Sequence, residues 1–206
     1  MCHDVRSRLF PKSKKIVLMV NTGRTDKEIV VDHLDLTNGH IHIIGDGKLT
    51  IYVTNKTTFG SGSTINRNGD VNKFNLFLKG SQGLLLRGSQ EIYGSIYAEK
   101  GDIDLGAGAG VKGNLFSGGQ SFKVSGGTWA TSPLIFAPYA HFDHSNGTIN
   151  GTLIAKSYSG TGGATLHQKD MDFIKGPISI EGINKENGNN NPTEWLIKKK
   201  QLLEKE

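Results

Sequence analysis

The fold is indicated by two consecutive segments, GSIYAEKGDIDLGAGAGVK (residues 94–112) and GNLFSGGQSFKVSGGTWAT (residues 113–131). Each segment is nineteen residues long, opens with glycine, and sets short apolar–polar alternations between glycine-rich corners. The same pattern continues, with variations, through residues 132–150 and 151–169. Self-similarity at a fixed period near twenty residues is the signature of a repeat architecture.

Apolar residues recur at the nineteen-residue step in three columns. The columns are Phe77, Ile96, Leu115, Leu134 and Leu153; Leu84, Ile103 and Phe122; and Ile92, Val111, Ala130 and Ile149. Three columns per period predict three short strands per coil, with successive coils paired as parallel strands about 4.8 Å apart. We therefore predict an all-β fold, a single-stranded parallel β-helix (β-solenoid). The usual handedness of parallel crossovers favours a right-handed coil.

The chain is expected to hold one solenoid domain with appendages. We place the solenoid at residues 28–183, with a loop insertion at 60–69 that breaks the nineteen-residue phase. Residues 184–191 form an Asn/Gly-rich linker. Residues 192–206 are predicted to form a short C-terminal helix with an apolar side, which would cap the stack or act as a tether.

Charge is concentrated at the start of the chain. Residues 1–27 carry seven Lys or Arg and two Asp, which equals the net charge of +5 of the whole chain. This basic N-terminal segment is interpreted as solvated, with attachment to an anionic surface as the alternative.

The single cysteine excludes an internal disulfide, and the apolar run at 16–20 is too short for a signal-peptide core. Either the protein is cytoplasmic, or an export segment lies outside this chain.

The coils also carry a family resemblance. The segments Gly94–Glu99, Val111–Leu115 and Gly151–Lys156 resemble coils of the glycine-rich β-solenoid domains of bacterial pilus-assembly and cell-surface proteins. They are similar, as a second choice, to bactofilins, which are polymer-forming cytoskeletal proteins. The first resemblance implies the cell surface, and the second implies the cytoplasmic face of the membrane. Neither resemblance implies catalysis.

The segment His141-Phe-Asp-His144 is the best candidate for chemistry. In the nineteen-residue phase, His141 and Asp143 would fall in apolar columns, where unpaired polar groups are costly. A slip of one residue would instead turn Phe142 inward and place His141 and Asp143 outward on one face. On a strand, His144 points the other way, so these three residues cannot supply the three ligands of a catalytic zinc site without a bend. We therefore expect no bound metal and no cofactor.

Other polar and aromatic patterns also favour a structural role. His40 and His42 are expected to face solvent on one strand, with His33 nearby in sequence. Asp102 and Asp104 also face outward, but no acidic ladder recurs at nineteen residues, so paired-carboxylate glycosidase chemistry is not supported. Threonines do not recur at the step expected of an ice-binding face. The aromatic residues are expected to point mainly inward, where they cannot stack on bases.

We therefore expect a non-catalytic structural module of the bacterial cell surface or pilus, active in assembly or adhesion. Its expected partners are other protein subunits or surface polymers, with self-association through the solenoid ends and no specific nucleic acid. The alternatives are a cytoplasmic, membrane-associated scaffold like the bactofilins, and a carbohydrate-binding or polysaccharide-degrading β-helix protein.

Overall fold

The computed structural model describes residues 16–37 and 39–168. All described residues belong to one compact unit, which lies within Met1–Gly176. The predicted linker at 184–191 and the predicted helix at 192–206 lie outside the described residues.

Fourteen strands and one short 3-10 helix make up the described part of the chain. Their bounds are β1 Ile16–Gly23, β2 Lys27–Leu36, β3 Gly39–Gly45, β4 Leu49–Phe59, β5 Thr64–Ile65, η1 Val71–Lys73, β6 Phe74–Leu78, β7 Leu84–Leu86, β8 Glu91–Tyr93, β9 Ser95–Ala98, β10 Ile103–Leu105, β11 Gly110–Lys112, β12 Leu115–Ser117, β13 Ser121–Val124 and β14 Trp129–His167. β14 is 39 residues long and bends through about two coils.

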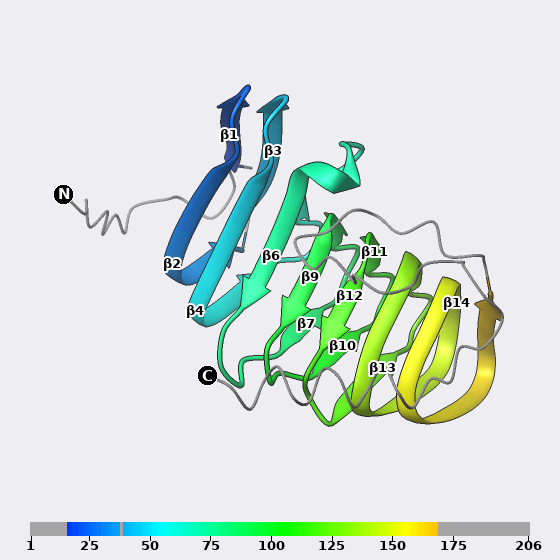
Figure 1. Cartoon of the computed structure of the whole chain (residues 1–206). Helices are drawn as coiled ribbons and strands as arrows, with labels where there is room; N and C mark the ends of the chain where they lie inside the picture. Colours follow the sequence, from blue (N-terminus) through cyan, green and yellow to red (C-terminus); the bar gives the residue numbers. More distant parts are fainter. Residues whose placement is uncertain (1–15, 38, 169–206) are drawn as a thin grey trace, which may run out of the picture. The chain divides into compact units, whose positions relative to one another are not determined.

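The strands form a parallel β-solenoid of about six turns, which confirms the predicted fold class (Figure 1). We call its three sheets faces A, B and C. Face A has the order β1-β3-β5-β8-β11-β14, face B the order β2-β4-β6-β9-β12-β14, and face C the order β7-β10-β13-β14. β1 is the first strand of face A, so the stack overlaps the basic segment at 1–27. The right-handed sense of the coil stays a prediction.

Two of the three predicted apolar columns are confirmed by the strand register. Ile103 pairs with Leu84 on one side and with Phe122 on the other. In the second column, Val111 pairs with Ile92 and Ala130. All six side chains are buried, as is Ile149, which extends the second column.

The column that starts at Phe77 is wrong in its details. Ile96 pairs with Leu76 rather than with Phe77, and Leu115 pairs with Ile135 rather than with Leu134. Both corrected steps are twenty residues long, because individual coils take up one additional residue at a corner. Leu115 and Ile96 are themselves neighbours one coil apart, as predicted.

The segment at 60–69 is only partly a loop. It contains β5, where Ile65 is fully buried and pairs with Ile41 and Ile92. The insertion therefore follows β5 and leads into η1, whose N-cap Asp70 accepts a hydrogen bond from the Asn72 backbone N–H at 2.9 Å. A short helix capped in this way returns the chain to face B.

One corner position shows why glycine opens the coils. Gly113 has φ +138°, and a Cβ placed there would collide with the carbonyl oxygen of Gly94 in the coil before it. Glycine adopts such positive φ values at little cost and leaves room for close approach of two backbones. The glycine that opens each segment is therefore a requirement of coil stacking.

Candidate functional site

An outward-facing ladder of aromatic rings runs along face B. Its members are Tyr52, Phe77, Tyr97, Phe116 and Phe136, contributed by five successive strands from β4 to β14. The ring centroids are separated by 5.0, 4.4, 4.7 and 6.4 Å in that order. Each ladder residue follows a buried aliphatic residue on the same strand, so the aromatic side chain points away from the core. We call this row the aromatic ladder.

The aromatic ladder corrects the expectation that the aromatic residues point mainly inward. Phe77 is half-buried and faces outward, while its neighbour Leu76 is fully buried. The sequence signal is an aliphatic–aromatic dipeptide in each coil, as in Ile96-Tyr97 and Leu115-Phe116. A search at a strict nineteen-residue step misses it, because one step of the ladder is 25 residues long and two are twenty.

Neighbouring rings of the aromatic ladder stack face to face on one another. The first four rings lie nearly parallel, at interplanar angles of 21°, 8° and 5°. Aromatic residues bind sugars or bases by offering an open ring face, and stacked rings offer mainly their edges. The ladder is thus arranged to stabilise the face and not to stack against a ligand. Burial also raises the pKa of Tyr97, which stays neutral at physiological pH.

The structure separates the three candidate metal ligands. Phe142 is inward, fully buried, and stacked on Phe122 at 4.7 Å, so the one-residue slip considered for this segment is the observed register. His141 is exposed and Asp143 half-buried on the outer side, whereas His144 is buried on the inner side. The two histidines therefore lie on opposite sides of one strand. Within residues 16–37 and 39–168, no group of three or more His, Cys, Asp or Glu is placed to hold a metal ion.

Both histidines use their ring nitrogens in contacts within the stack. The His141 Nδ1 is 2.9 Å from the Ser157 hydroxyl and its Nε2 is 3.1 Å from the Ser159 hydroxyl, both in the next coil. The His144 Nε2 lies 3.0 Å from the Gly147 carbonyl oxygen, and its Nδ1 lies 3.2 Å from the Tyr158 hydroxyl. This arrangement suits a neutral His144 that donates from Nε2 and accepts at Nδ1.

Stability is expected to depend on pH through His144. Burial lowers the pKa of His144, and the hydrogen bond to Gly147 and the charge of Asp143 only partly offset this effect. The unfolded chain then binds the proton at higher pH than the folded chain, so stability is full above the unfolded pKa of about 6.5 and falls as pH decreases below it. We expect a lower melting temperature at pH 5.5 than at pH 7.5, with a smaller difference in His144→Gln. His141→Gln is the control, and its melting temperature should change between pH 7.5 and pH 5.5 as much as that of the wild type. If this change were reduced equally in both variants, the pH dependence could not be assigned to His144.

The remaining polar candidates are engaged in structural contacts. His33 lies on β2 beside Asp32, with 2.7 Å between Nδ1 and Oδ2, and so is not on the strand that carries the other two histidines. The His40 Nδ1 lies 2.9 Å from the Thr64 hydroxyl in the next coil. An imidazole cluster of His33, His40 and His42 is therefore not formed.

The two outward aspartates also act within the stack. The Asp102 carboxylate accepts backbone N–H groups of Gln120 and Ser121 at 2.8 and 2.9 Å. Asp104 forms an ion pair with Arg87, with 2.6 Å between Oδ2 and Nη2. Each carboxylate thus ties its own coil to a neighbouring segment.

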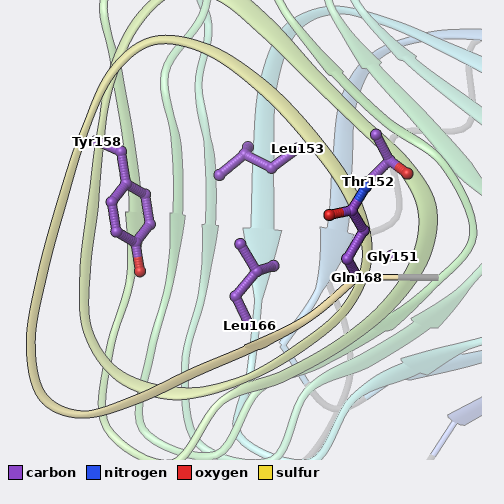
Figure 2. Close-up of a pocket in the computed structure, with 6 residues that line it drawn as sticks. All are labelled: Gly151, Thr152, Leu153, Tyr158, Leu166 and Gln168. Carbon is purple, nitrogen blue, oxygen red and sulfur yellow. The ribbon is translucent and has the colours of Figure 1, made fainter.

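A cavity of about 290 Å³ opens inside the last described coil (Figure 2). The side chains of Leu153, Tyr158 and Leu166 point into it, and Gly151, Thr152 and Gln168 complete its lining. It lies on the inner side of β14, where the preceding coils carry the buried apolar side chains of the core. The cavity is therefore a continuation of the core at the end of the described coils.

Two family models match parts of the chain. The chain belongs to the family described as a domain of unknown function (DUF7305), whose model matches residues 12–128. Residues 116–168 are similar to a second family, described as "Putative Ice-binding-like adhesive domain". No curated protein and no solved structure matches the chain. Across the described ranges, no helix is long and apolar enough to span a membrane.

Proposed function

We propose that this protein is a non-catalytic structural module of the bacterial cell surface, which presents a rigid β-solenoid for adhesion or for assembly with pilus or surface proteins. The observation that carries the proposal is the similarity of residues 116–168, the last described coils, to an adhesive domain. Those coils continue the same core as the preceding ones, so the adhesive-like part and the rest of the described chain form one stack.

Rigidity is the property that the described residues support best. Inward apolar columns fill the core, and the aromatic ladder ties five strands together on the outside of face B. Such a body transmits force along its axis and displays side chains at fixed spacings. Its partners on this proposal are surface polymers or protein subunits.

A non-catalytic role is supported by how the polar side chains are used. His141, His144, Asp102 and Asp104 each make hydrogen bonds or ion pairs that join one coil to another or close a corner. A catalytic group needs instead a polar atom directed at a substrate. The aromatic ladder also gives little support to the carbohydrate-binding alternative, because its first four rings are stacked face to face on one another.

The proposal is tested by locating the protein on cells. Antibodies against the purified chain should label intact cells of the source bacterium as strongly as permeabilised cells, with a cytoplasmic protein labelled only after permeabilisation. A deletion strain should adhere less well than the wild type, and the intact gene should restore adhesion. Labelling that requires permeabilisation would overturn the surface assignment and favour the bactofilin-like cytoplasmic scaffold.

A further inference from the structure

In the described part of the chain, the first strand of the solenoid is paired along one edge only. β1 pairs with β3 along one edge, and no described strand pairs with its other edge. Figure 1 shows β1 as the outermost strand of face A, at the blue end of the stack. Four consecutive residues of β1 are large, apolar and exposed: Ile16 (38%), Val17 (49%), Leu18 (52%) and Met19 (56%).

Within β1 itself, the described residues carry none of the usual protection of an edge against pairing. No residue from Ile16 to Gly23 is charged, and the first five are all apolar. β2 closes the same coil and is also an edge strand, but it carries Lys27, Glu28, Asp32 and Asp35. Charged residues are the common device that blunts an edge, and a long neutral apolar edge is a site for strand pairing. Of these two edges of the first coil, β1 is therefore the one suited to pairing.

We propose that β1 pairs antiparallel with β1 of a second copy of this chain, so that face A continues across a symmetric dimer. The inference deepens the proposed function by naming the surface and the partner through which this module assembles. Antiparallel self-pairing follows from two-fold symmetry, which is the commonest symmetry of homo-oligomers. It places neutral apolar side chains opposite neutral apolar side chains, with no like charges in register. Self-pairing of β2 would instead bring its acidic residues toward those of the second copy.

The two sides of β1 have different roles in such a dimer. Leu18 pairs with the buried Ile41 and Val20 with the half-buried Ile43, so both belong to the inner side of face A. Val17 and Met19 pair with His40 and His42 and belong to the outer side. A two-fold axis at Leu18 places Val17 of one copy opposite Met19 of the other. Lysines at these two outer positions would repel each other across the interface while leaving the core of each copy unchanged.

The test compares the mass of the full-length chain in solution with that of a charged variant. We expect the wild type to be dimeric by light scattering and sedimentation, and Val17→Lys/Met19→Lys to raise the dimer dissociation constant at least about tenfold. The control is Val30→Lys/Leu85→Lys, which adds the same charge at exposed aliphatic residues of β2 and β7 (69% and 57% exposed) and should stay dimeric. Circular dichroism and thermal unfolding show whether each variant is folded.

A cross-linking variant keeps the proposal testable if the lysine variant does not fold. In a Cys2→Ser background, Leu18→Cys should form a disulfide-linked dimer under mild oxidation, because the two-fold axis sets this position opposite itself, whereas Leu85→Cys should not. A monomeric wild type, an unchanged dimer in the β1 lysine variant, or open-ended filaments would each overturn the proposal. None of these three outcomes would contradict the proposed location at the cell surface. Conversely, a failure of antibodies to label intact cells would not contradict the proposed dimer.

Discussion

Replacing Phe142 with alanine is expected to lower the free energy of unfolding by about 3–5 kcal/mol, the range found when a fully buried Phe is truncated. Phe142 is completely buried, pairs with Phe122, and stacks on its ring at 4.7 Å. Removing its ring leaves a cavity that the surrounding coils can close only in part. Chemical denaturation of the wild type and variant measures the difference.

The same experiment distinguishes two registers of the coil. His141→Ala and Tyr139→Ala alter exposed side chains of the same strand and should change stability by no more than about 0.5 kcal/mol. The strict nineteen-residue phase predicts the reverse order, with His141 in the core column. A large loss in His141→Ala together with a negligible loss in Phe142→Ala would therefore contradict the observed register.

The sequence predicted the fold class well because glycine corners and apolar columns repeat at almost constant spacing. The column through Ile103 and Phe122 was correct because each of these residues is separated by one charged residue from the next apolar residue of its strand, Leu105 or Val124. This alternation identifies the buried side without ambiguity. Where apolar and polar residues alternate in this way, the sequence alone identifies the residues that point inward.

Face B could not be assigned in this way, because its strands are apolar on both sides. Leu76-Phe77, Ile96-Tyr97 and Leu115-Phe116 each place a buried aliphatic residue beside an outward aromatic one. Two adjacent apolar residues erase the period of two, so a column can shift from one side to the other without any visible break. Because some coils are twenty residues long, a strict nineteen-residue step moves from an inward residue to the outward residue beside it. The sequence analysis therefore missed the aromatic ladder.

The candidate site was predicted only as a set of alternatives. The sequence shows that His141 and Asp143 share one side of a strand and that His144 lies on the other. It does not show which side is buried, because that depends on the one additional residue accommodated before Ile135. The contacts of His141 with Ser157 and Ser159 join residues sixteen and eighteen positions apart, and they follow only once that register is known.

Leu115→Ala is the second substitution expected to have a large effect, a loss of about 2–5 kcal/mol in the free energy of unfolding. Leu115 is fully buried between Ile96 and Ile135, which are fully buried in the coils before and after it. In a solenoid each coil is stabilised by its contacts with its neighbours, so a cavity here weakens two interfaces between coils at once.

Leu85→Ala is the matched control, because it removes the same atoms from a side chain that is 57% exposed on the outer side of face C. Its effect should stay within about 0.5 kcal/mol. The comparison rests on the midpoint and the slope of the denaturation curve, since a loss of cooperativity between coils would lower the slope. If Leu115→Ala unfolds at the same midpoint as Leu85→Ala with an unchanged slope, Leu115 is not in the core, and the stacking of β9, β12 and β14 described above is incorrect.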